Sequence, residues 1–182
     1  LVCLSVMGPG KGEGMMSRTE ENLKAAFAGE SQANRKYLAF AQKADADGYN
    51  GIAKLFRAAA HAETIHALRE LSDLGGVKST AENLRAAIEG ETYEYTDMYA
   101  RFLDEARSEG VKDAARTFAW AKAAEEVHAR LYQMALDAAN RGEDLKVHGA
   151  WVCRKCGNIE FGEAPEKCSI CGHPREWFQP VD

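Results

Sequence analysis

Four apolar stripes with helical spacing run along residues 17–142, and a carboxylate interrupts each stripe near its middle. Apolar positions three and four residues apart share one face of an α-helix, and such a face normally packs into a core. An ionised carboxylate in a closed core is strongly destabilising unless a positive partner lies beside it. The interrupting acids are Glu30, Glu63, Glu91 and Glu125, and Glu94 lies beside the third stripe. The pattern predicts an all-α four-helix bundle whose interior holds something positively charged.

Capping and stop signals divide this region into four helices. Capping boxes at Ser17-x-x-Glu20 and Ser79-x-x-Glu82 begin the first and third helices, and glycines follow the ends of all four. The expected helices cover residues 17–47, 52–74, 79–110 and 112–140. Composition then changes, because the remainder holds four cysteines, three of the four prolines and aromatic residues without helical spacing. We expect a bundle over residues 17–145, a small module over 146–182, and a disordered extension over 1–16.

Two Glu-x-x-His motifs identify the positive partner as metal. Glu63-x-x-His66 and Glu125-x-x-His128 each place a carboxylate and an imidazole one turn apart on one helix face. Glu30 precedes Glu63 by 33 residues and Glu91 precedes Glu125 by 34, so the two halves share one arrangement. This is the ligand set of ferritin-like di-iron and di-manganese bundles. Carboxylate mixed with imidazole suits iron or manganese better than copper.

Four of the five cysteines lie within 19 residues near the C-terminus. They form two Cys-x-x-Cys-Gly turns separated by 11 residues, and such a pair predicts one metal ion held by four thiolates. The predicted ligands are Cys153, Cys156, Cys168 and Cys171. On the cysteines alone, iron and a structural zinc remain equally open. We assign no role to Cys3, His61, His148 or His173.

Charge and hydropathy exclude several classes of partner. A net charge of −5 gives no reason to expect nucleic acid or an anionic membrane, since both favour a basic surface. No apolar run approaches the roughly 20 residues that a membrane-spanning helix needs. The apolar opening lacks a basic leader, and the cysteines have metal-ligand spacing rather than a disulfide pattern, so we expect a cytoplasmic protein.

Residues 18–182 resemble the rubrerythrin family. The resemblance is carried by the Glu30, Glu63-x-x-His66, Glu91-x-x-Glu94 and Glu125-x-x-His128 bundle, by the segment 90–96, and by the two cysteine turns. It implies a peroxidase, protective against oxidative stress, that reduces hydrogen peroxide to water at two iron ions. It also implies a single iron in the four-cysteine module that returns electrons, with Glu94 and His66 exchanging as ligands of one iron. Tyr37 and Tyr99 are either core aromatics or residues that orient the metal carboxylates.

The resemblance further implies NAD(P)H as the ultimate electron source. No dinucleotide-binding motif is present, so rubredoxin or a flavin-containing NAD(P)H reductase must deliver the electrons. Two other functions fit parts of the sequence: a ferritin-like ferroxidase, and a helical protein with a structural zinc ribbon. The extra carboxylate Glu94 and the appended cysteine module argue against iron storage.

The connection between the second and third helices predicts how the chain assembles. A ferritin-like bundle runs these two helices parallel, so the connection must return on the order of 30 Å if Glu63 and Glu91 share one level. Residues 75–79 reach roughly 17 Å when fully extended. We therefore expect a homodimer with exchanged helical hairpins, and a single-chain up-down-up-down bundle is the alternative.

Overall fold

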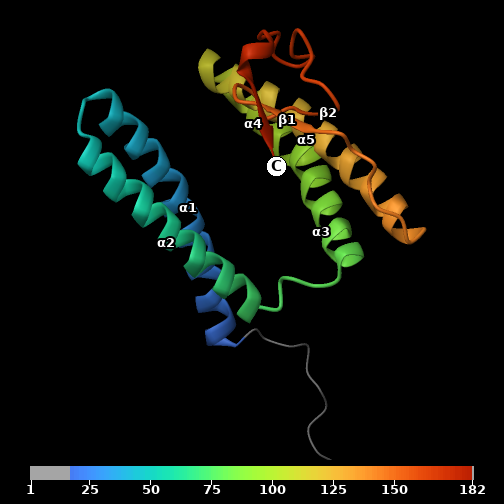
Figure 1. Cartoon of the computed structure of the whole chain (residues 1–182), viewed down its shortest axis with the longest axis horizontal. Helices are drawn as coiled ribbons and strands as arrows, with labels where there is room; N and C mark the ends of the chain where they lie inside the picture. Colours follow the sequence, from blue (N-terminus) through green and yellow to red (C-terminus); the bar gives the residue numbers. More distant parts are fainter. Residues whose placement is uncertain (1–16, 182) are drawn as a thin grey trace, which may run out of the picture. The chain divides into compact units, whose positions relative to one another are not determined.

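The computed structural model describes residues 17–181 and confirms the predicted fold class, which is mostly helical with a small C-terminal cysteine module (Figure 1). The chain folds into two compact units that divide between Val77 and Lys78. The extension expected over residues 1–16 lies outside the described residues. None of the described helices is long and apolar enough to cross a bilayer.

The first unit is a hairpin of two antiparallel helices, α1 (Arg18–Ala46) and α2 (Asn50–Asp73). The Ser17 hydroxyl caps α1 by accepting a hydrogen bond from the Glu20 amide, as the capping signal predicts. The buried apolar side chains between the two helices are all alanines: Ala41, Ala44, Ala53, Ala60 and Ala67. Large apolar side chains lie outside, and Leu55 and Leu68 are 69% and 60% exposed. This hairpin has no core of large side chains within itself.

The second unit contains the remaining helices. They are α3 (Thr80–Tyr93), the π-helical segment η1 (Glu94–Met98), α4 (Tyr99–Ser108) and α5 (Lys112–Asn140). The capping box at Ser79 and Glu82 forms in both directions. The expectation of one regular helix over residues 79–110 is wrong between Glu94 and Met98, where the backbone widens into a π turn. The structure also begins α2 at Asn50, two residues before the expected Ile52.

The cysteine module follows α5 in the same unit. Its strands β1 (Ala150–Cys153), β2 (Ile159–Phe161) and β3 (Phe178–Val181) form an antiparallel sheet in the order β2-β1-β3, and a short 3₁₀ turn, η2 (Arg175–Trp177), precedes β3. Its small core contains Cys153, Ala164, Cys168 and Phe178. Gly157 and Gly172 have φ of 83° and 73°, the left-handed conformation that lets each cysteine turn close behind its thiolates. The expected division at residues 145 and 146 remains a prediction and falls between α5 and β1.

Candidate metal centres

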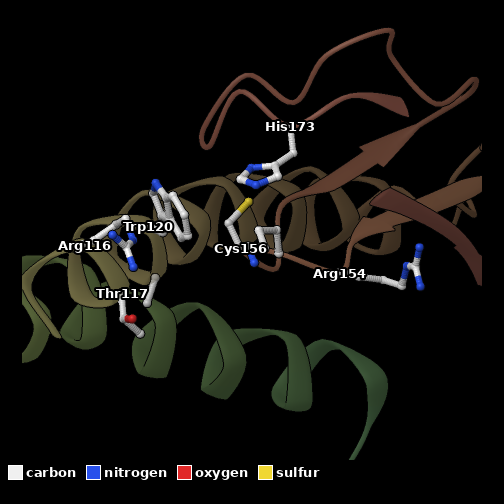
Figure 2. Close-up of a pocket in the computed structure, with 8 residues that line it drawn as sticks. Arg116, Thr117, Trp120, Arg154, Cys156 and His173 are labelled. Atoms are coloured by element: carbon white, nitrogen blue, oxygen red, sulfur yellow. The ribbon is translucent and has the colours of Figure 1, made fainter. Parts of the chain in front are cut away.

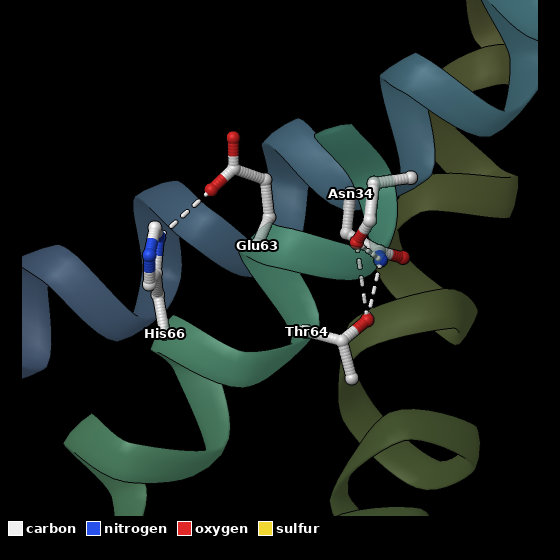
Figure 3. A network of polar contacts seen from close by, with 5 residues as sticks. Asn34, Glu63, Thr64 and His66 are labelled. Carbon is white, nitrogen blue, oxygen red and sulfur yellow. Dashed lines mark hydrogen bonds and ion pairs between the residues drawn. The ribbon is translucent and has the colours of Figure 1, made fainter. Parts of the chain in front are cut away.

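The first unit brings together three of the predicted ligands, Glu30, Glu63 and His66. Ligand atoms of these three residues all lie within 4.8 Å of one another. His66 Nδ1 lies 3.0 Å from Glu63 Oε2, as Figure 3 shows. A hydrogen bond with Glu63, together with burial and the Glu63 charge, raises the pKa of Glu30. Two neighbouring carboxylates repel each other when both are ionised, so a cation bound beside them is stabilised.

A buried amide holds the helices of this first site together. The Asn34 side-chain nitrogen donates to the Ala60 carbonyl at 2.6 Å and to Thr64 Oγ1 at 2.8 Å, so it ties α1 to α2 (Figure 3). Asn34 lies one turn after Glu30, and Thr64 directly follows Glu63. The sequence placed Asn34 on the core stripe but did not show its role. A buried amide between two ligand helices fixes their register, because a shift of either helix breaks both hydrogen bonds.

The second unit repeats the cluster with Glu91, Glu125 and His128, whose ligand atoms also lie within 4.8 Å of one another. His128 Nδ1 is 2.7 Å from Glu125 Oε2 and 3.6 Å from Glu91 Oε2. Burial and the neighbouring Glu125 carboxylate raise the pKa of Glu91 to about 7. The Glu91 Oε2 atom is buried and has no hydrogen-bond partner in the described structure. An orphaned carboxylate oxygen beside an imidazole and a second carboxylate fits a metal ligand.

Two matching aromatic clusters show how the halves differ. Tyr37, Phe40 and Phe56 pack at ring distances of 6.3, 6.2 and 5.6 Å, and their counterparts in the second unit pack at 6.3, 6.1 and 5.6 Å. Those counterparts are Tyr99, Phe102 and Phe118. Tyr37 follows Glu30 by seven residues, whereas Tyr99 follows Glu91 by eight. The one extra residue is accommodated by the π turn over Glu94–Met98.

The π turn begins at Glu94, the extra carboxylate of the sequence analysis. Burial and the Glu125 carboxylate raise the pKa of Glu94, so its side chain lies in the field of the second cluster. Glu94 is nevertheless not among the three residues whose ligand atoms lie within 4.8 Å. Burial and the same Glu125 carboxylate raise the pKa of the Tyr99 hydroxyl. The predicted roles of Tyr37 and Tyr99 beside the metal ligands remain predictions.

The four predicted cysteines meet in the C-terminal module with their sulfur atoms within 4.8 Å of one another. The Cys153–Cys171 and Cys156–Cys168 sulfur distances are 3.7 and 3.5 Å. A tetrahedral ion with metal–sulfur bonds of about 2.3 Å needs sulfur separations of about 3.8 Å, so the donor set fits a tetrahedral metal. Cys153 and Cys168 are buried, whereas Cys156 and Cys171 are partly exposed. The site therefore reaches the surface on one side.

One hydrogen bond joins the cysteine module to the second carboxylate cluster. His128 Nε2 lies 3.0 Å from the carbonyl oxygen of Gly157, the residue that follows Cys156. If Nε2 carries the proton and donates it, Nδ1 is left with a lone pair toward Glu125 and Glu91, as a metal ligand requires. This contact could not be predicted from the sequence, because it joins residues 29 apart through a backbone carbonyl.

The raised pKa values of Glu91 and His128 predict that the metal-free protein becomes less stable as the pH rises. The folded state holds protons on Glu91 up to about pH 7 and on His128 above its ordinary pKa of 6.5, and both pKa values are raised on folding. The folded form therefore binds more protons than the unfolded chain, and the free energy of unfolding falls as pH rises through this range. We expect the Tm of the metal-free protein to fall between pH 5 and pH 8.

Circular dichroism melts at several pH values measure this effect. Loading with Fe²⁺ under anaerobic conditions should reverse the slope, because metal binding displaces the same protons. Glu91→Gln should flatten the slope of the metal-free protein, whereas Glu89→Gln on the same helix should not. A metal-free Tm that is constant or rises with pH would contradict the protonated cluster.

Comparison with known proteins agrees with these sites. A family model described as rubrerythrin matches residues 21–136, and one described as the rubrerythrin rubredoxin-like domain matches residues 151–179. The chain is 40% identical to the rubrerythrin of Porphyromonas gingivalis, over 91% of this chain and 90% of that protein. It is 42% identical to the nigerythrin of Nitratidesulfovibrio vulgaris, over 88% of this chain and 85% of that protein.

Solved structures give the same result. The fully reduced, all-ferrous state of nigerythrin matches with a TM-score of 0.54 and 36% identity, over 94% of this chain and 91% of that chain. The partially reduced state of nigerythrin matches with the same TM-score, identity and coverage. The matched segments contain every ligand residue of the two carboxylate clusters and the four-cysteine site. The chain therefore belongs to the rubrerythrin family, with that family's di-iron site and its rubredoxin-like four-cysteine iron site.

Proposed function

We propose that this rubrerythrin is a peroxidase that reduces hydrogen peroxide to water with electrons passed through the four-cysteine iron. Rubrerythrins are generally oxidoreductases, and the family places both iron sites on this chain. The observation that carries the proposal is the His128–Gly157 hydrogen bond, which connects a di-iron ligand to the turn that holds Cys156. A module that served only to stabilise the fold would not need that connection.

The number of electrons needed to reduce peroxide matches a di-iron site supplied by a single four-cysteine iron. Hydrogen peroxide takes up two electrons and two protons to give two water molecules. A pair of ferrous ions, when bound, supplies both electrons at once, and the single four-cysteine iron replaces them one at a time. Cys156 and Gly157 are adjacent, so the route from thiolate to imidazole is two residues of backbone and one 3.0 Å hydrogen bond. The chain thereby provides a short covalent and hydrogen-bonded path between its two metal sites.

The π turn provides the asymmetry that redox cycling needs. Glu94 lies beside the second cluster but outside its three-ligand group, whereas the matching position in the first unit, three residues after Glu30, is Ala33. His66 is the most exposed of the predicted ligands, with 56% of its side chain accessible. We propose that Glu94 and His66 are the exchangeable ligands, since Glu94 lies outside the three-ligand group of the second cluster and His66 is the most exposed of the predicted ligands.

The division of the metal ligands between the two units supports an exchanged dimer. Each unit holds three ligands of the six-ligand set, so neither completes the di-iron site by itself. Residues 74–79 connect α2 to α3 and reach roughly 20 Å when extended. That is less than the roughly 30 Å that a parallel return would require. The exposed Leu55 and Leu68 of the first hairpin also need a covering surface. We propose that the second hairpin of a partner chain covers them and completes the site.

Glu94→Ala should keep both iron sites and the fold but slow peroxide reduction by about tenfold or more, because the exchangeable carboxylate is lost. Single-turnover oxidation of the fully reduced protein, followed by stopped-flow absorption, measures this directly. Glu126→Ala, an exposed acid on α5, is the matched control and should react at the wild-type rate. Wild-type kinetics in the Glu94 variant would remove Glu94 from the reaction.

Cys156→Ser should remove the thiolate-to-iron absorption and abolish NAD(P)H-linked turnover. Chemically reduced di-iron centres in the same variant should still consume one equivalent of peroxide, because the ligands of that site are intact. Coupled turnover with a reductase, measured beside a single-turnover assay, separates the two activities. Linked turnover that survives the substitution would show that electrons enter elsewhere and would favour a structural metal in the module.

The exchanged dimer can be tested by mixing chains. A heterodimer of a Glu63→Ala chain with a Glu125→Ala chain should recover about half of the wild-type di-iron content if the hairpins exchange, because one site regains all its ligands. Each variant homodimer, in which every site lacks one ligand, is the control. A purified heterodimer with no more di-iron content than the homodimers would contradict exchange.

A further inference from the structure

An open cleft of about 820 Å³ lies beside the partly exposed side of the four-cysteine site (Figure 2). Its walls come from α5 and from the cysteine module, both within the second unit. The lining residues are Arg116, Thr117, Trp120, Ala121, Arg154, Lys155, Cys156 and His173. Cys156 is the only predicted metal ligand among these eight residues. An electron donor that binds in this cleft therefore lies beside a thiolate ligand of the iron site.

The cleft is basic although the chain is acidic. Three of its eight lining residues carry permanent positive charge and none is a carboxylate, whereas the chain has a net charge of −5. Arg116 is paired with Asp113 at 2.7 Å in an exposed salt bridge. Arg154 and Lys155 form no ion pair with a carboxylate within residues 17–181. A local reversal of sign at a redox site attracts and orients a partner of opposite charge.

Aromatic rings hold these cations in place. The Arg116 guanidinium lies 5.6 Å from the Trp120 ring, and Lys155 Nζ lies 5.0 Å from the Trp177 ring. His173 stands edge-on between the two indoles, with ring distances of 5.9 and 5.4 Å. Tryptophan and arginine at a cleft edge are the residues that most often anchor protein interfaces. His173, which the sequence left without a role, thus connects the two sides of the cleft.

We propose that this cleft is the docking surface for an acidic, one-electron carrier protein that reduces the four-cysteine iron. The inference rests on the proposed electron relay. In the step itself one electron leaves the reduced centre of the carrier and converts ferric to ferrous iron, with no bond made or broken. A nicotinamide transfers a hydride, which holds two electrons, so it does not match a single iron that accepts one. The opposite side of the same turn, at Gly157, then passes the electron toward His128.

Charge reversal at Arg116 tests the surface without touching a metal ligand. The probe is reduced rubredoxin, a small acidic protein with one four-thiolate iron. The signal is the reduction of ⁵⁷Fe placed in the full-length protein, followed by freeze-quench Mössbauer spectroscopy, because oxidised rubredoxin regains the same visible colour that the four-cysteine site loses. At low ionic strength Arg116→Glu should slow the second-order rate by about tenfold, within the range that electrostatic steering supplies. It should also weaken the dependence of that rate on salt. Arg130→Glu, at an exposed position on the same helix that forms no ion pair within residues 17–181, makes the same charge change and should leave the rate unaltered.

Two further measurements separate docking from other effects. Zinc-substituted rubredoxin cannot transfer electrons, and calorimetry with it should show binding that weakens by about tenfold in Arg116→Glu. Photoreduced deazaflavin, a neutral reductant, should reduce the wild type and the variant at equal rates. Lys155→Gln, which removes one charge from the other wall, should give a smaller decrease in the rubredoxin rate.

The outcomes distinguish this proposal from the proposed function. Equal rubredoxin rates and affinities in wild type, Arg116→Glu and Arg130→Glu would overturn the docking surface even if peroxide is still reduced. Competition by oxidised dinucleotide for the cleft would also overturn it, in favour of a small anionic ligand. If the iron is reduced by rubredoxin as expected but the reduced protein does not react with peroxide, the surface stands and the peroxidase proposal fails.

Discussion

The structure depends on the repulsion among partly buried carboxylates and on the cations that relieve it. Glu91 and Glu125 share a partly buried site with His128, and their proximity raises the pKa of Glu91 to about 7. Glu30 and Glu63 are held together in the same way in the other unit. Without metal these groups must share protons, which makes the empty sites costly at neutral pH. Two bound iron ions would neutralise this repulsion and link the helices that carry the ligands.

The same constraint explains the small side chains of the helices. Large apolar residues near the ligands would hold the helices too far apart for carboxylates from neighbouring helices to meet a common ion. Alanines at positions 41, 44, 53, 60 and 67 let α1 and α2 approach closely. The Asn34 amide then fixes the register that this close contact leaves free to slide. Metal ligation by Glu30, Glu63 and His66 would add stability that these small buried side chains do not provide.

The repeat of ring clusters and ligand motifs makes the two hairpins near copies, and the π turn is the point at which they differ. The one extra residue between Glu91 and Tyr99 is accommodated in the π turn that begins at Glu94, and the packing of Tyr99, Phe102 and Phe118 still matches that of the first unit. A pseudosymmetric site would hold two metals equally. Glu94 places an additional carboxylate beside only one of the two clusters, so the surroundings of the two clusters differ chemically.

The fold class, the residues of the two carboxylate clusters, the four cysteines and the capping boxes at Ser17 and Ser79 could be predicted from the sequence alone, because each has a short-range signature. Apolar spacing, Glu-x-x-His and Cys-x-x-Cys-Gly all act within a few residues, and the rubrerythrin family follows from them. Features that depend on contacts between distant segments became visible only in the folded chain. The π turn at Glu94, the Asn34 clamp, the His128–Gly157 hydrogen bond and the basic cleft beside Cys156 all belong to this second group. These features depend on contacts with backbone carbonyls or on the packing of one element against another. The identities of residues that are neighbours in the sequence do not reveal such contacts.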